Sequence, residues 1–277
     1  MSEPYRPDWN SFARANASQR WRQQSAAMGS DATRAITAEA RIEPGLAVLD
    51  VASGTGEPAI SVASAMNGTG RVVATDISEG PLKIARERAA PRNLTNIEFQ
   101  QADAMALPFA DRSFDRITSR VGVMFFADVL VAIREFHRVL KPGGRVSLLT
   151  WGPMDQPYFM TTAGTILKML AGSAVPEAAA KMFKFADPQL LHDLYAAAGF
   201  TTIDSRVVPV AWTWPGTPEE VWAYFQDVTI PFKPLLDSIP AERRAEMDAA
   251  VVTEIARLWD GKKVEFGARF VMATAVR

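Results

Sequence analysis

The sequence predicts a doubly wound α/β fold with a mostly parallel sheet, an antiparallel end and a helical cap. Short apolar segments alternate with helix-like segments between residues 46 and 151, and a glycine turn follows the first apolar segment. Two further strand-like segments come late in the chain and are separated by helices. These observations predict seven strands, five in a parallel arrangement and two at an antiparallel end.

The first part of the chain supplies the five parallel strands. They are expected at residues 46–52, 71–77, 96–103, 114–123 and 145–151. A helix follows the glycine turn in SGTGEPAISVASAM, and further helices are expected at 81–90 and 129–140. The last of these stops at Lys141-Pro142-Gly143-Gly144, because proline and glycine do not continue a helix.

The regular alternation of strand-like and helix-like segments ends after residue 151. Helices are expected at 155–172, 187–198, 217–228 and 240–259, and strands at 201–214 and 262–277. Residues 44–277 therefore form one predicted domain, with helical cap insertions within about 152–190 and 215–260. Residues 1–43 form a separate helical segment, which either packs on the domain or acts as a lid over a ligand.

Composition excludes several classes of function. The chain of 277 residues has a net charge of -1, no cysteine and two histidines. Nucleic-acid binding is disfavoured because a broad basic field is absent. The absence of cysteine excludes thiolate chemistry, and two histidines disfavour a multi-histidine metal site. No apolar segment is long enough for a membrane span and no signal peptide is visible, so a cytoplasmic protein is expected.

The segment Asp50-Val51-Ala52-Ser53-Gly54-Thr55-Gly56 carries the chemistry. Its two glycines allow a tight turn and a close approach of ligand to backbone, and the next helix begins at that turn. Asp76 ends the second strand, 20 residues after Gly56, where an acid can accept both hydroxyls of a ribose. The sequence therefore predicts a nucleoside site at the carboxyl ends of parallel strands.

A glycine turn with a later acid also fits a loose dinucleotide fingerprint, so a nicotinamide-dependent oxidoreductase is one alternative. Two acids favour another cofactor. Asp50 lies inside the first strand, where an extra anion does not help to bind a pyrophosphate, and it could orient the loop or face an amine. Asp103 ends the third strand, where it could accept a hydrogen bond from an adenine amino group. A non-catalytic nucleoside-binding protein is a further alternative.

Five segments in consecutive order resemble one family. VLDVASGTGEPAI, VVATDIS, QADAMALPFADRSFD, ITSRVGVMFFAD and RVLKPGG are similar to the class I S-adenosylmethionine-dependent methyltransferases, and specifically to the ubiquinone/menaquinone C-methyltransferase-like branch. The resemblance covers about residues 46–151. It implies a Rossmann-like fold, S-adenosylmethionine as cofactor and methyl transfer as the reaction.

The resemblance also implies a role for each matching position. Backbone of Ala52, Gly54 and Gly56 would face the methionine part of the cofactor, and Asp50 would support that loop and the cofactor's amine. The other implied contacts are Asp76 for the ribose hydroxyls, Ile77 for the adenine face, Asp103 and Ala104 for the adenine edge, and Ser119 for the sulfonium. Many relatives carry a histidine pair where this chain has Met124-Phe125-Phe126, which puts a histidine base in doubt.

The predicted acceptor is a small, largely apolar or aromatic metabolite that is methylated on an O, N or C atom. Its expected contacts are Arg120, Met124, Phe125, Trp151 and Tyr158. The cap adds Trp222, Tyr224, Phe225 and Phe232, although these aromatics could equally form the core of the cap or a homodimer contact. His137 and His192 are expected to be structural, no metal is expected, and the sequence names no catalytic base.

Overall fold

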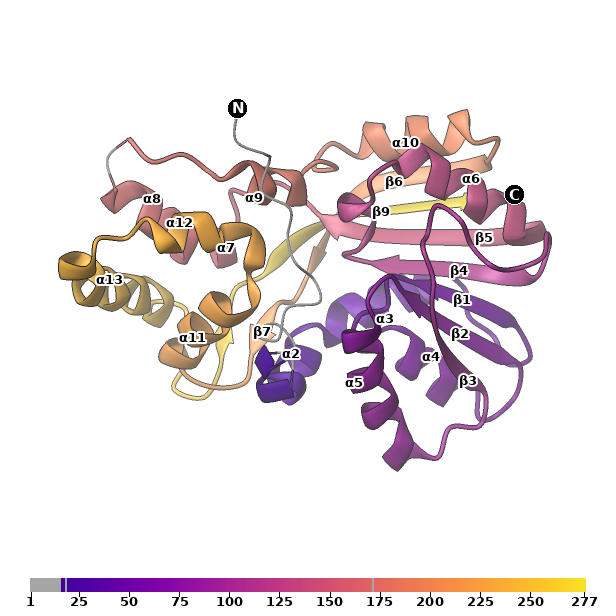
Figure 1. Ribbon diagram of the computed structural model, residues 1–277, viewed down its shortest axis with the longest axis horizontal. Helices are drawn as coiled ribbons and strands as arrows, with labels where there is room; N and C mark the ends of the chain where they lie inside the picture. Colours follow the sequence, from indigo (N-terminus) through magenta and orange to yellow (C-terminus); the bar gives the residue numbers. More distant parts are fainter. Residues whose placement is uncertain (1–15, 18, 171) are drawn as a thin grey trace.

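The computed structural model describes residues 16–17, 19–170 and 172–277 (Figure 1). Its main sheet has seven strands in the order β3-β2-β1-β4-β5-β9-β6. The strands are β1 (Ala47–Val51), β2 (Arg71–Asp76), β3 (Ile97–Gln101), β4 (Phe114–Arg120), β5 (Leu140–Trp151), β6 (Thr201–Val210) and β9 (Ala268–Val276). The strands β1 to β5 pair in parallel, and β9 pairs antiparallel with both β5 and β6. The predicted sheet with its antiparallel end is confirmed.

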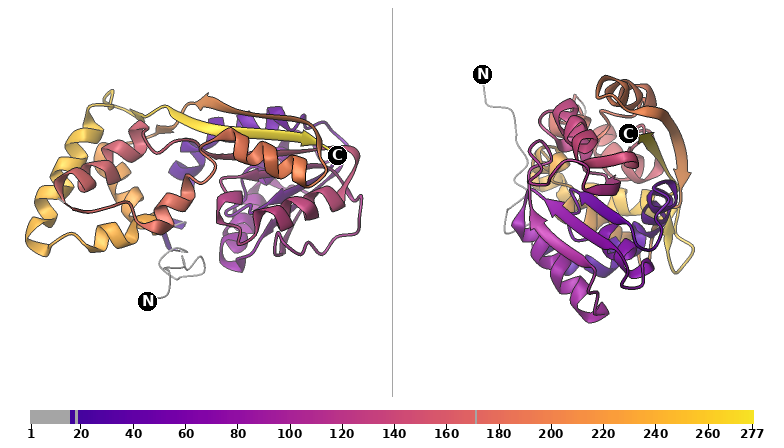
Figure 2. Two further views of the ribbon diagram at one scale, coloured as in Figure 1. Left: turned by 90° about the horizontal axis from the view of Figure 1, so that it is seen from above. Right: turned by 90° about the vertical axis from the view of Figure 1, so that its right-hand side faces the viewer.

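Helices cover both faces of the sheet (Figures 1 and 2). One face carries α3 (Ser30–Glu39), α4 (Ala59–Ala65) and α5 (Glu79–Ala89), and the other carries α6 (Val129–Val139) and α10 (Pro188–Ala197). This division follows from right-handed crossovers, since the chain moves from β1 towards β3 in one direction and from β4 towards β5 in the other. The central strands are apolar on both sides as a result, with Val48 packed under α4 and Leu49 in the core of the opposite face.

The helical cap lies at one end of the sheet (Figure 1). It contains α7 (Pro157–Thr161), α8 (Ala163–Met169), α9 (Glu177–Met182), α11 (Pro218–Val228), α12 (Lys233–Asp237) and α13 (Arg244–Ala256). Helix α11 begins with a capping box, in which the Thr217 hydroxyl accepts from the Glu220 N–H and the Glu220 carboxylate accepts from the Thr217 N–H. Trp222, Phe225 and Phe232 are buried in the cap, so they form its core.

Three sequence predictions need correction. The helix predicted at 155–172 is broken at Thr162, whose φ and ψ of -99° and -96° are not helical, and it divides into α7 and α8. The strand predicted at 201–214 ends at Val210, and the strand predicted at 262–277 is interrupted at Gly267, whose φ is +58°. The separated pieces, β7 (Thr213–Trp214) and β8 (Val264–Glu265), pair with each other in a second sheet.

The predicted N-terminal segment of residues 1–43 is described only in part, because residues 1–15 and 18 lie outside the described structure. Helix α3 packs against β4, β5 and β6. Helix α2 (Arg22–Met28) lies beside β7, between the sheet and the cap. The two helices therefore join the sheet and the cap.

Candidate active site

A cavity of about 480 Å³ opens at the carboxyl ends of β1, β2 and β4, below the cap. This volume is in the range of small-molecule sites. Its wall is formed by the loops after these strands, by the loop after β3, by α2 and by the cap. Of the four contacts predicted from the cap, Tyr224 lines it. Of the fourteen other predicted contact residues, ten line it: Ala52, Gly54, Asp76, Ile77, Asp103, Ala104, Arg120, Phe125, Trp151 and Tyr158. Asp50, Gly56, Ser119 and Met124 do not.

The loop after β1 presents backbone to the cavity. Ala52 and Gly54 both have positive φ values, of +56° and +54°. An added Cβ on Gly54 would meet no atom within 4 Å, so this part of the loop is open to a ligand. Gly56 is needed for packing, because a Cβ at this position would lie 2.5 Å from the Ile60 side chain. It allows the loop to pack closely on α4.

Asp76 closes the glycine loop onto β2. One carboxylate oxygen accepts from the Gly54 N–H at 2.9 Å, and the other accepts from the Ser78 N–H at 2.9 Å. Each carboxylate oxygen has a second lone pair, so the same carboxylate can also accept from a ligand hydroxyl. The next residue, Ile77, lines the cavity with 58% of its surface exposed, which is unusual for a large apolar residue.

Asp50 lies behind the loop. It is fully buried, with one oxygen accepting from the Thr118 hydroxyl at 2.7 Å and the other from the Ala59 N–H at 3.3 Å. Burial raises the pKa of Asp50 to about 7, although both hydrogen bonds act in the opposite direction. These bonds join β1 to β4 and to the start of α4. Its side chain does not reach the cavity.

Asp103 and Ala104 lie in a long loop between β3 and β4, which contributes to the cavity from Ala102 to Met105. The Asp103 carboxylate accepts from the Met105 N–H at 2.9 Å, and this local turn fixes the side chain. A loop of this length without secondary structure needs anchors elsewhere.

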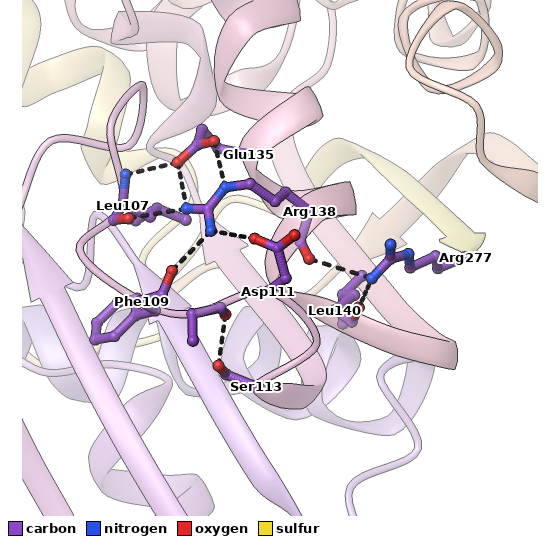
Figure 3. A network of polar contacts seen from close by, with 9 residues as sticks. Leu107, Phe109, Asp111, Ser113, Glu135, Arg138, Leu140 and Arg277 are labelled. Atoms are coloured by element: carbon purple, nitrogen blue, oxygen red, sulfur yellow. Dashed lines mark hydrogen bonds and ion pairs between the residues drawn. The ribbon is translucent and has the colours of Figure 1, made fainter.

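Arg138 of α6 supplies the anchor of this loop (Figure 3). Its guanidinium donates to the carbonyls of Leu107 and Phe109, at 2.9 and 2.7 Å, and to Asp111 at 2.8 Å. Glu135 holds the guanidinium from the other side with two bonds of 2.7 Å, and accepts from the Leu107 N–H at 2.9 Å. The motif RVLKPGG thus fixes the cavity loop from outside the cavity.

Glu57 and Arg88 form a buried ion pair that the sequence analysis missed. Arg88 Nη2 lies 3.0 Å from Glu57 Oε1, and Arg88 also donates to the Thr55 carbonyl. The second Glu57 oxygen accepts from the Ser61 hydroxyl at 2.6 Å. Glu57 lines the cavity, so the pair supports the outer half of the glycine loop. Its sequence signal was weak, because Arg88 lies 31 residues after Glu57 on a helix whose sequence is typical of an ordinary crossover.

The end of β4 forms the middle of the wall. Ser119 is buried behind the wall, whereas Arg120, Val121 and Gly122 line it. Val121 has a φ of +58°, a conformation that is strained for a β-branched residue. Strain of this kind is concentrated at functional sites.

Aromatic residues surround the cap side of the cavity. Trp151 is only 5% exposed and stacks on Phe270, with ring centroids 4.5 Å apart, so it is largely a core residue with an edge on the cavity. Phe125 and Tyr158 also line the cavity, together with Trp212, which was not predicted. Met124 is buried in the core instead.

Tyr158 carries the polar atom of this apolar half. Thr229, which also lines the cavity, lies close enough to lower the pKa of the Tyr158 hydroxyl. Burial is the larger effect and raises the pKa of Tyr158 well above its usual value. The phenol therefore stays protonated at neutral pH.

The N-terminal segment completes the wall. Trp21, Arg22 and Ser25 line the cavity, and the Trp21 indole makes edge contacts with Trp214 and Tyr224. The pattern of widely spaced aromatics in residues 1–43 gave no direct signal of which side chain would reach the ligand.

The histidines lie away from the cavity. His137 packs edge-on against Phe200 with centroids 5.0 Å apart, and His192 lies beside Asp193 near the surface. Among the residues that the structure describes, no group of three or more His, Cys, Asp or Glu side chains could hold a metal ion. In the same part of the chain, no helix is both long and apolar enough to cross a membrane.

Comparison with known proteins gives consistent matches. A model of the ubiE/COQ5 methyltransferase family matches residues 20–208. A demethylmenaquinone methyltransferase of Staphylococcus epidermidis is 35% identical over 175 residues, which cover 60% of this chain and 72% of that protein.

Solved structures share the fold. Phosphoethanolamine N-methyltransferase 2 of Haemonchus contortus, in complex with S-adenosyl-L-methionine, has a TM-score of 0.58 and 16% identity, covering 98% of this chain and 61% of that chain. The [4+2]-cyclase SpnF has a TM-score of 0.54 and 22% identity, covering 92% of this chain and 82% of that chain. A fold that serves both proteins does not by itself define the reaction.

Proposed function

The chain belongs to the ubiE/COQ5 methyltransferase family and uses S-adenosylmethionine, and we propose that its acceptor is a small, largely apolar molecule with an aromatic or quinone-type ring. The observation that carries this proposal is the division of one cavity into two unlike halves. One half presents the glycine loop and the carboxylates of Asp76 and Asp103, and the other presents aromatic side chains.

The first half fits the cofactor. Asp76 has lone pairs for the ribose hydroxyls, and the exposed side chain of Ile77 offers an apolar surface to the adenine ring. Asp103 and Ala104 would bind the adenine edge, and the open backbone at Ala52 and Gly54 would bind the methionine part. Asp50, Gly56 and Ser119 would support these contacts from behind.

The second half fits a ring. Phe125, Trp151 and Tyr158 would enclose it together with Trp212, and Arg120 lies where the two halves meet. The relative from Staphylococcus epidermidis is named for demethylmenaquinone, a quinone, which agrees with an aromatic chamber. Met124 would act only through packing behind Phe125.

The bound cofactor supplies an electrophilic methyl group on a sulfonium. The task of the chain is to align the acceptor with that methyl group and to exclude water. Aromatic faces such as that of Phe125 can stabilise positive charge beside them. Tyr158 stays protonated, so it would donate a hydrogen bond to the acceptor and would not remove a proton from it. The proton of the acceptor would then be lost to solvent before binding, as in a phenolate, or pass to a carboxylate of the cavity, which would also take the proton displaced from a methylated ring carbon.

Two alternatives from the sequence are disfavoured. A nicotinamide cofactor does not agree with the family, and neither does a purely nucleoside-binding role. A direct test is calorimetric titration with S-adenosylhomocysteine and NAD, followed by transfer of isotope-labelled methyl to phenolic, reduced quinone, indole and amine compounds, with tRNA and a protein extract alongside. Binding of the first ligand and labelling of a ring compound are expected. Labelling of the macromolecules alone would overturn the proposed acceptor class.

A further inference from the structure

Arg120 ends β4 and lines the cavity where its two halves meet. We propose that Arg120 is the receptor for a carboxylate, or a similar small oxyanion, of a ligand bound in this cavity. This inference rests on the proposed function in assuming that the cavity takes small-molecule ligands. It adds the charge that one of those ligands must carry.

The guanidinium of Arg120 has few protein partners. Nη1 donates to the Gly29 carbonyl at 3.0 Å. Nε is buried and has no hydrogen-bond partner, and no carboxylate of the described residues lies within ion-pair distance of the group. A buried charge without a partner is costly, and arginine presents a fork of donors that matches a carboxylate.

The acids near Arg120 are already engaged. Glu57 and Asp50 both act on its charge from a distance. The oxygens of Glu57 are held by Arg88 and Ser61, at 3.0 and 2.6 Å. Asp50 is bound by Thr118 and Ala59 behind the wall. Neither acid therefore pairs directly with the Arg120 guanidinium, which keeps an unpaired positive charge at this point of the cavity wall.

The backbone leaves space for the guanidinium. Gly29 joins α2 and α3 at a φ of -85°, a conformation open to any residue. An added Cβ at Gly29 would lie 2.3 Å from Arg120 Nη1. Glycine at this position therefore keeps the guanidinium in place, and alanine would displace it without removing its charge.

The oxyanion has two sources in a methyltransferase. One is the carboxylate of the methionine part of the cofactor, and the other is an acidic group on the acceptor. Three binding probes distinguish them by calorimetry: S-adenosylhomocysteine, 5′-methylthioadenosine, which has the same nucleoside and thioether but no carboxylate, and 1-naphthoate with its neutral amide as reference.

The variants are Arg120→Met, Arg120→Lys and Gly29→Ala. Arg116→Met is the control, because Arg116 lies on the same strand but outside the cavity lining and donates to the carbonyls of Arg41 and Asp115. In Arg120→Met we expect a loss of affinity of about 10- to 100-fold for one carboxylate probe and no loss for its neutral reference. A loss of affinity for S-adenosylhomocysteine identifies the cofactor as the source of the oxyanion, and a loss of affinity for 1-naphthoate identifies the acceptor as its source.

The single change Gly29→Ala should cause much of the same loss of affinity, because it displaces the Arg120 guanidinium. Added to Arg120→Met, it should cause little further loss, because the guanidinium is then already absent. Arg120→Lys should keep part of the affinity. Unchanged affinity for every probe in Arg120→Met, or equal losses for charged probes and their neutral references, would overturn the proposal. If the wild type does not bind S-adenosylhomocysteine, the assigned cofactor site fails, and the 1-naphthoate arm still tests Arg120.

Discussion

The Trp21 indole donates a hydrogen bond of 2.7 Å to the carboxylate of Asp227. These residues are 206 positions apart, and their contact joins the N-terminal segment to α11 of the cap. Arg20 adds an exposed ion pair to the same carboxylate at 3.1 Å. Because Trp21 also lines the cavity, this contact holds one wall of the site in position.

Trp21→Phe should loosen that wall, because phenylalanine keeps most of the packing but cannot donate the bond. We expect a loss of about 1 kcal/mol in the free energy of unfolding and faster proteolysis of the N-terminal segment. Arg20→Gln is the matched control: it removes only an exposed ion pair, so stability should change by less than about 0.5 kcal/mol. Equal effects of the two changes would show that the indole bond has no special part in closing the wall.

Asp76→Ala should weaken binding of S-adenosylhomocysteine by about 1–3 kcal/mol, measured by calorimetry. Alanine removes the acceptor for the ribose and also releases the Gly54 and Ser78 N–H groups. His137→Gln should leave both cofactor affinity and turnover nearly unchanged, because that ring packs on Phe200 away from the cavity. Loss of turnover in a folded His137→Gln protein would contradict the structural role of this histidine.

Asp50→Asn should change how stability depends on pH. The pKa of Asp50 is raised from 3.8 to about 7 in the folded protein, so between about pH 4 and pH 7 the folded state binds a proton that the unfolded state has released. The contribution of Asp50 to the free energy of unfolding therefore falls as pH rises through that window, by at most about 1.4 kcal/mol per pH unit, and levels off above it. Asparagine does not titrate, and Thr118 can reverse its hydroxyl to accept from the amide.

Denaturant unfolding from pH 5 to pH 8 would measure this effect as the difference between wild type and Asp50→Asn. The difference should move in favour of asparagine as pH rises towards 7. A difference that is flat with pH would show that the Asp50 carboxyl is not protonated in the folded protein in this range.

Arg138→Met should weaken cofactor binding from outside the cavity. The change removes the anchors of the loop that carries Asp103 and Ala104, so the loop must be ordered when the ligand binds. Lys141→Met is the control, because it breaks the ion pair with Asp115 at the opposite end of β4. We expect reduced affinity for S-adenosylhomocysteine only in Arg138→Met, measured well below the thermal midpoint of both variants, since the loss of the Arg138 hydrogen bonds also lowers stability.

The sheet could be predicted from the sequence because its central strands are buried on both faces and its helices end at clear signals. Lys141-Pro142-Gly143-Gly144 after α6 is one such signal. The pairing of β7 with β8 was missed, since it depends on contacts between distant segments, and the interruption at Thr162 was missed as well. Apolar periodicity cannot show whether Trp151 packs on Phe270 or lines the cavity, and in the structure it does both.

The candidate site was predictable where a motif places a residue at the end of a strand, as with Asp76, Ile77 and Asp103. Motif position did not distinguish two neighbouring residues at the end of β4. The side chain of Ser119 is buried behind the cavity wall, whereas Arg120 lines the cavity. Motif position alone also did not distinguish a supporting role from a ligand contact for Asp50. Charge partners far apart in sequence, such as Glu57 and Arg88, could not be recognised without the fold.

Tyr158→Phe tests the aromatic half with little change in volume. The variant removes the hydroxyl that would donate to the acceptor. Affinity for S-adenosylhomocysteine should stay the same, whereas kcat/KM for the acceptor should fall by about 5- to 30-fold, corresponding to about 1–2 kcal/mol of lost hydrogen bonding.

Phe125→Ala should raise KM for the acceptor as well, because the variant loses contact area with it. Trp151→Ala is less informative, because removing a core indole costs about 3–5 kcal/mol of stability. If Tyr158→Phe and Phe125→Ala both bind cofactor and methylate the acceptor as the wild type does, the acceptor does not occupy the aromatic half of the cavity.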